Sequence, residues 1–221
     1  MTPEPVPEDG PWLARPWRTV AVAAAGAVMF VALCLAVAAA DGPFGIDVAW
    51  YDAMVAAETP WLVAVAHGFD FLGSTKVMLP LGVAVAVWLA GLRRWRTFAL
   101  WAVATLSAAA AMTVTKWFFD RERPPLPLDV EATSSFPSGH ATLAAAFGLT
   151  LAVVLTPPGR RRGAALVAAA AYAVLMALSR TYLRVHWLSD VVGGVLLGTV
   201  VALTTVAVAD TLARRRPDRS P

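Results

Sequence analysis

Three short polar clusters interrupt an otherwise apolar chain, and their residue types suit the handling of a phosphate ester. The clusters contain two of the chain's three histidines and one of its two lysines. They are Lys116 with Arg123-Pro124, Pro137-Ser138-Gly139-His140, and Ser179-Arg180 with His186 and Asp190. Cationic side chains can bind phosphate oxygens, and an imidazole can attack phosphorus or transfer a proton.

The third cluster has the pattern of an oriented imidazole. His186 and Asp190 are four residues apart, so they would share one face of a helix. Asp190 can then accept the Nδ1–H of His186 and leave the Nε2 lone pair free. That is the orienting logic of a catalytic triad, with the imidazole as nucleophile. The alternative is a purely structural His–Asp pair, because a carboxylate in an apolar span needs a partner.

The other two clusters offer groups that bind anions. Ser138 is a good N-cap for the apolar helix that follows, and the backbone N–H groups of Ser138, Gly139 and His140 would form an anion site at its positive end. Lys116 ends an apolar stretch, and Arg123 follows it in a Pro-rich loop. The compact ammonium of the lysine and the planar guanidinium of the arginine could then bind the same anion. The alternative for residues 137–140 is an ordinary capped helix with a polar end. The alternative for Lys116 and Arg123 is that they are helix-end cations whose side chains only extend to the membrane surface.

Taken together, the clusters resemble the three signatures of the type 2 phosphatidic acid phosphatase superfamily. Those signatures read Lys-x6-Arg-Pro, Pro-Ser-Gly-His and Ser-Arg-x5-His-x3-Asp, and all three are complete here, in the family's order and at its spacings. The signatures fall within residues 116–190, and the resemblance covers roughly residues 60–205. It implies a six-helix membrane enzyme whose site faces away from the cytoplasm.

The resemblance, with the chemistry above, implies a role for each signature residue. The residues expected to bind phosphate oxygens are Lys116, Arg123, Ser138, Gly139 and Arg180. His186 would attack phosphorus to form a phosphohistidine, and Asp190 would stabilise the resulting cation. His140 would protonate the leaving alkoxide and then activate water. Because the cations would neutralise the phosphate, we expect no metal ion or other cofactor. We expect the loop carboxylates of Asp129 and Glu131 to be solvated rather than catalytic.

The expected substrate is a membrane lipid phosphate, either a phosphatidate-like monoester or a polyprenyl pyrophosphate. The phosphate clamp does not discriminate between these, and phosphate transfer to an acceptor other than water uses the same chemistry. A different class of protein, a six-span transporter or an inactive lipid-binding protein, is the alternative function. A transporter would place polar groups near mid-membrane, where these spans lack them. No nucleic-acid partner is expected, and the sequence does not indicate the oligomeric state.

The elements that must position these clusters are membrane helices. The 221 residues are 58% hydrophobic and have a mean hydropathy of +0.64, which exceeds the values of an ordinary soluble domain. We predict an all-α bundle of six transmembrane spans, with an interfacial helix before the second span over residues 61–72. The spans are expected over residues 19–40, 77–92, 97–115, 141–156, 163–178 and 187–209. The single Cys34 excludes a disulfide framework.

The ends of the chain differ from the membrane domain expected over residues 19–209. Residues 1–18 are rich in Pro and Glu and are predicted to be a disordered cytoplasmic segment. Residues 210–221 are predicted to be a basic cytoplasmic tail. Residues 38–40 resemble a signal-peptide cleavage site, but the apolar run before them is longer than a signal peptide's, so an uncleaved anchor is favoured.

Charge gives an independent test of topology. Alternating the six spans places twelve cations on one membrane side: Arg15, Arg18, Arg93, Arg94, Arg96, Arg160, Arg161, Arg162, Arg214, Arg215, Arg216 and Arg219. The positive-inside rule makes that side cytoplasmic, so both cluster histidines, His140 and His186, face outward. The Arg- and Ala-rich composition suggests a bacterial source, which predicts a multi-pass protein of the bacterial plasma membrane.

Overall fold

The all-α prediction is confirmed. The structure is a computed structural model that describes residues 12–215, and within that range it contains eight helices and no strand. The helices are α1 (Pro16–Ala39), α2 (Gly45–Ala56), α3 (Pro60–Gly73), α4 (Thr75–Gly91), α5 (Trp95–Phe119), α6 (Gly139–Leu155), α7 (Arg160–Tyr182) and α8 (Leu188–Arg214).

Four of these helices, α1, α5, α7 and α8, are long and apolar enough to cross a membrane. The helices α3 and α4 satisfy the same criterion as a pair and meet at a bend of 43°. At 17 residues, α6 is shorter and would reach only about 26 Å. The expected count of six spans requires both the bent pair and α6, so it stays a prediction.

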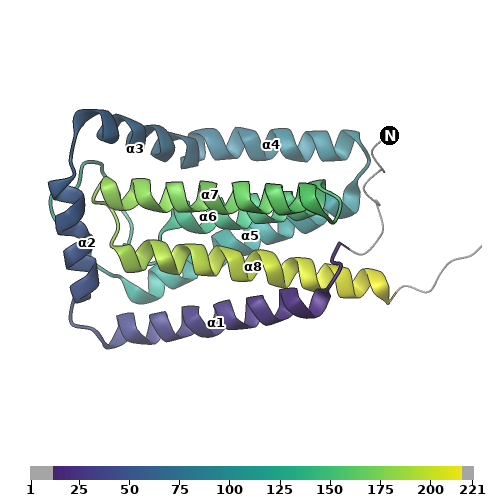
Figure 1. Cartoon of the computed structure of the whole chain (residues 1–221), viewed down its shortest axis with the longest axis horizontal. Coiled ribbons are helices and arrows are strands. Elements are labelled where there is room, and N and C mark those ends of the chain that lie inside the picture. Colours follow the sequence, from purple (N-terminus) through teal and green to yellow (C-terminus); the bar gives the residue numbers. More distant parts are fainter. Residues whose placement is uncertain (1–11, 216–221) are drawn as a thin grey trace, which may run out of the picture.

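The second and third helices differ from the expected interfacial element. α2 crosses one end of the bundle, whereas α3 runs lengthwise in line with α4 (Figure 1). α3 packs against α7 and contains residues 61–72, so the expected interfacial placement is not confirmed. The break between α3 and α4 lies at Ser74, whose backbone is extended and whose Oγ donates to the carbonyl of Phe71 at 2.7 Å.

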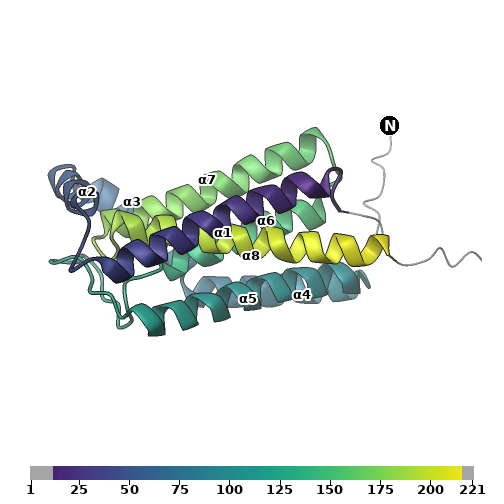
Figure 2. The same cartoon turned by 90° about the horizontal axis from the view of Figure 1, so that it is seen from below.

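The centre of the bundle is the contact between α6 and α8. α6 also packs against α5 and α7, and Figure 2 shows α7 on one side of the central pair and α5 on the other. The close approach depends on Gly194 and Gly198 of α8. A Cβ on Gly194 would lie 2.6 Å from the carbonyl oxygen of Ser138, and one on Gly198 would collide with that of Thr142. Small residues four apart allow such backbone approach between membrane helices.

Within residues 12–215, the Arg clusters gather at one end of the bundle, as the alternation of spans predicted. Arg162, near the start of α7, donates to the carbonyl of Trp12, and Arg214, at the end of α8, donates to that of Leu13 at 2.6 Å. Arg94, just before α5, donates to a carbonyl near the end of α6. α1 begins and α8 ends at this end, opposite α2 (Figure 1).

The disorder expected for residues 1–18 does not extend to residues 12–18. Trp12 is buried, the backbone N–H of Leu13 donates to the buried carboxylate of Asp210 at 2.9 Å, and α1 begins at Pro16. An apolar side chain and a satisfied backbone group order this stretch. Residues 1–11 and 216–221 lie outside the described residues, and residues 210–214 of the expected tail continue α8.

We predict that Gly198→Ala destabilises the protein, because its Cβ would meet the backbone of α6, which cannot move alone. Overpacking of this kind costs about 1–3 kcal/mol. Gly68→Ala is the matched control, since nothing lies within 4 Å of the added atom and alanine favours the helix. Thermal unfolding in detergent measures both, and a Gly198→Ala protein as stable as the control would contradict the packing argument.

Candidate active site

The eight signature residues to which a role is assigned lie at the end of the bundle crossed by α2. A cavity of about 630 Å³ opens there, between the end of α5, the start of α6, the junction of α3 and α4, and the loops that follow α5 and α7. The signature residues that line it are Lys116, Arg123, Gly139, His140 and His186. The other three, Ser138, Arg180 and Asp190, have no exposed surface. Arg180 pairs with Glu131 and Asp190 lies beside His186, both of which line the cavity. The backbone N–H of Ser138 donates to the carbonyl of Asp190. Segments separated by about 70 residues of sequence therefore meet at one place.

Asp190 is held by donors from three directions and faces His186. Its Oδ2 lies 3.5 Å from His186 Nδ1 and also accepts from Ser135 Oγ and from the backbone N–H of Trp187 at 2.8 Å. Arg121 Nη1 donates to Oδ1 at 2.6 Å. Because Asp190 is in the first turn of α8, the helix itself fixes the carboxylate beside His186.

The imidazole of His186 is neutral at physiological pH. Its side chain is almost fully buried in the loop between α7 and α8, and this burial lowers its pKa to about 3. The attraction of Asp190 acts in the opposite direction and is the smaller effect. His186 lines the cavity, and its Nε2 lies 3.5 Å from Arg123 Nη1. A neutral imidazole with its Nδ1 side toward a carboxylate presents a nucleophilic Nε2.

The two cations of the first signature are fixed by backbone carbonyls. Lys116 is in the last turn of α5, and its ammonium donates to the carbonyl of Ser134. The chain then turns at Asp120, which has a left-handed φ of 40°. Arg123 Nε donates to the carbonyl of Thr133 at 2.9 Å, and burial lowers the pKa of its guanidinium. Both positive groups therefore have defined positions on the cavity wall.

Ser138 occupies the N-cap position of α6, but its hydroxyl does not cap the helix. The Oγ is buried and has no hydrogen-bond partner in the part of the chain that the structure describes. A buried unsatisfied hydroxyl is costly, so the position fits a donor reserved for an anion. Gly139 keeps the space open, because a Cβ there would lie 2.8 Å from the sulfur of Met112.

Arg180 is already paired with two carboxylates. Its guanidinium forms ion pairs with Asp70 of α3 and with Glu131 of the loop before α6. Asp70 Oδ1 also lies 3.4 Å from His140 Nε2, and Glu131 Oε2 lies 3.8 Å from Arg123 Nη2. The expectation that Glu131 is merely solvated is wrong, because its side chain is only 26% exposed and contacts two site cations.

Three of these side chains are of the types that coordinate metal ions. Asp70, Glu131 and His140 bring one ligand atom each to within 4.8 Å of one another. However, Arg180 pairs with both carboxylates and balances their charge, so a divalent ion would compete with a resident guanidinium. The residues therefore do not fit a metal well, and metal independence stays a prediction.

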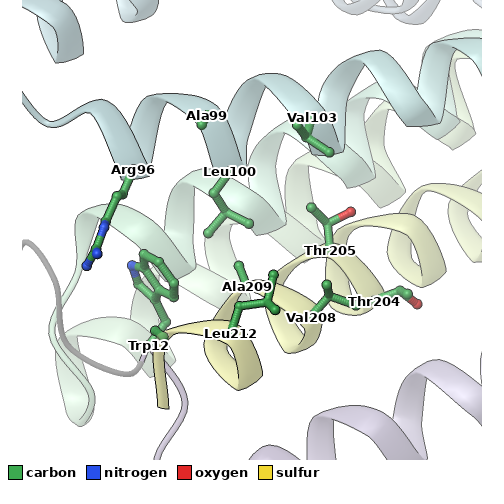
Figure 3. A pocket seen from close by; sticks show the side chains of 11 residues that line it. Trp12, Arg96, Ala99, Leu100, Val103, Thr204, Thr205, Val208, Ala209 and Leu212 are labelled. Carbon is green, nitrogen blue, oxygen red and sulfur yellow. The ribbon is translucent and has the colours of Figure 1, made fainter. Parts of the chain in front are cut away.

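A second cavity, of about 430 Å³, lies at the opposite end between α5 and α8 (Figure 3). Trp12 and Arg96 line it together with aliphatic side chains and threonines. None of the described residues that line it is a histidine or a carboxylate. Its threonine hydroxyls have no imidazole or carboxylate among the lining residues to act as a base, so it is not a candidate active site.

The fold and the site define a multi-pass helical membrane protein with a cationic, histidine-bearing cavity at one end. The chain belongs to the PAP2 superfamily, which its residues 97–214 match.

The chain is similar to two phosphatases of known name. It is 32% identical to phosphatidylglycerophosphatase B of Bacillus subtilis over 161 residues, which cover 70% of this chain and 79% of the relative. It is also 32% identical to decaprenylphosphoryl-5-phosphoribose phosphatase of Mycobacterium tuberculosis over 189 residues, or 79% and 95% of the two chains.

The fold is similar to that of a solved structure. The crystal structure of the transmembrane PAP2-type phosphatidylglycerolphosphate phosphatase from Bacillus subtilis superimposes with a TM-score of 0.79 at 29% identity. The alignment covers 88% of this chain and 98% of that chain. The helical arrangement is thus that of a PAP2 membrane protein.

We predict that His186 makes the protein less stable as the pH falls. Its pKa is about 3 in the folded protein and about 6.5 when unfolded, so the unfolded chain binds the proton more readily between these values. Acidification from pH 6.5 to pH 4 therefore favours unfolding. His186→Gln should show a weaker loss of thermal stability over this interval, and an identical pH dependence would contradict the assignment of a buried neutral imidazole.

Proposed function

We propose that this protein removes phosphate from a membrane lipid through a phosphohistidine on His186, without a metal ion. The observation that carries the proposal is a neutral His186, with Asp190 on one side and a cavity holding Lys116 and Arg123 on the other. The names of both phosphatase relatives describe action on lipid-linked phosphates, which supports a lipid substrate.

In the first step, the phosphate oxygens would bind the two cavity cations, the free Ser138 hydroxyl and the Gly139 N–H. Arg180 would join by exchanging a protein carboxylate for phosphate. His186 Nε2 attacks phosphorus as the bond to the lipid oxygen breaks, and His140 gives its proton to that oxygen. The imidazole becomes a cation in the phosphohistidine, and Asp190 stabilises it.

In the second step, His140 is neutral and takes a proton from water. The hydroxyl attacks phosphorus, and the P–N bond breaks with its electron pair returning to His186 Nε2. The site regains its initial protonation and releases inorganic phosphate. Because every reacting bond belongs to the terminal phosphate, a monoester and a pyrophosphate are equally suitable, and a panel of both lipids decides between them.

We also propose six membrane crossings, with the bent pair α3–α4 as the second and α6 as the fourth. The Arg-rich end would then be cytoplasmic and the cavity would face outward from the bacterial plasma membrane. α1 packs along α8, which supports an uncleaved first span. At headgroup depth, a lipid phosphate can reach the cavity while its chains stay in the bilayer.

His186→Ala should abolish turnover and phosphoenzyme formation, with a loss of ~10⁴-fold or more, because it removes the nucleophile. His140→Ala should slow both steps by ~10²–10⁴-fold, because it removes the acid and base. His67→Ala is the matched control, since His67 is 44% exposed and lines no part of the cavity. Phosphate release from lipid in detergent measures all three, and an active His186→Ala enzyme would refute the mechanism.

EDTA should leave the rate unchanged to within ~2-fold, because guanidinium and ammonium groups supply the positive charge that a Lewis acid would supply. The assay uses the purified protein with and without a chelator, followed by addition of Mg²⁺ or Mn²⁺. Loss of activity with EDTA and its recovery with a divalent cation would instead assign a metal to Asp70, Glu131 and His140.

A further inference from the structure

The short helix α2 carries one buried side chain, the carboxylate of Asp47. This side chain has no exposed surface, although it belongs to a helix that crosses the outside of the bundle. Its Oδ1 accepts the backbone N–H of Ser189 at 2.8 Å, and its Oδ2 accepts the hydroxyl of the same residue at 2.7 Å. Ser189 precedes Asp190 in the first turn of α8, so Asp47 is bound beside the partner of His186.

Arg121 connects the two buried carboxylates. Its Nη2 donates to Asp47 at 2.9 Å, while its Nη1 donates to Asp190 at 2.6 Å and to Ser189 Oγ at 2.7 Å. The guanidinium lies 5.5 Å from the ring centroid of Phe44, which precedes α2, and its side chain is only 9% exposed. Neither Asp47 nor Arg121 belongs to a signature, and neither lines the phosphate cavity.

The balance of charge in this cluster gives Asp47 a role beyond packing. With both carboxylates ionised, Asp47, Arg121 and Asp190 carry a net charge of −1. That single negative charge is available to a cation that forms on His186, 3.5 Å from Asp190. Without Asp47, Arg121 would neutralise Asp190 and the cluster would carry no net charge. Buried charges are weakly screened, so the imbalance would reach His186.

We propose that Asp47 is a positioning residue for the proposed reaction: by binding Arg121 and Ser189 it keeps Asp190 in place and keeps its negative charge available to His186. This inference rests on the proposed function, because it requires a positive charge to form on the imidazole. It makes α2, an element without a family signature, part of the support of the active site.

Asp47→Asn in the full-length protein tests the proposal. We expect kcat to fall ~10- to 100-fold, the range seen when outer-shell partners of a functional ligand are removed, while KM changes less than ~3-fold. Rapid-quench measurement with a ³²P-labelled lipid phosphate should show phosphoenzyme formation slowed by the same factor. Asp52→Asn, an identical change at an exposed position of α2, is the matched control and should behave as wild type.

The double variant Asp47→Asn/Arg121→Gln separates charge from packing. Removing both charges restores the net −1 of the cluster, and the glutamine amide can still donate to Asp190. We expect the double variant to be at least ~5-fold faster than Asp47→Asn, whereas a purely structural role predicts that it is no faster. Asp47→Glu, which keeps the charge, should remain within ~5-fold of wild type.

Each outcome decides a separate question. Wild-type kcat in Asp47→Asn, or a double variant no faster than the single one, would overturn the role of Asp47. If Asp47→Asn does not fold, the double variant decides, and its failure to fold would assign Asp47 a structural role and overturn the proposal. An active His186→Ala enzyme would instead overturn the proposed function itself.

Discussion

The buried carboxylate of Asp190 is the group around which the end of the bundle crossed by α2 is arranged. A charge with no exposed surface is stable only when donors surround it, and the donors come from separate parts of the chain. Trp187 comes from the turn before α8, Ser135 from the loop before α6, and Arg121 from the loop after α5. The imidazole of His186 lies beside them, with its Nδ1 3.5 Å from the carboxylate. The hydrogen bonds to this one carboxylate therefore hold together the loops that carry the first two signatures.

The helix packing below sets the position of the anion site relative to that carboxylate. The glycines of α8 allow α6 to approach until the backbone N–H of Ser138 donates to the carbonyl of Asp190 at 3.0 Å. Phe136 reinforces the contact, because its ring covers Gly193 and packs edge-to-face against Phe119 with centroids 5.2 Å apart. The start of α6 and the start of α8 therefore meet as one rigid unit.

Much of this arrangement could be predicted from residue spacing. The signatures identified the residues that line or support the cavity, and the alternation of apolar runs placed them at one end with the Arg clusters at the other. Asp47, Asp70 and Glu131 were missed as site residues, because their roles depend on tertiary contacts with Arg121 and Arg180. In the sequence, each of them is visible only as a carboxylate in a mostly apolar segment or in a loop. Likewise, hydropathy marks an apolar run but not that α3 lies along α7.

The ion pairs of Arg180 have a consequence for which lipids this site can distinguish. Asp70 and Glu131 are tethered to the same protein, so they compete for the guanidinium at a high effective concentration. A terminal phosphate with two negative charges can displace them, whereas the singly charged diester of an ordinary phospholipid is a much weaker competitor. In the proposed reaction, this internal competition would keep the abundant diester lipids of the bilayer out of the site.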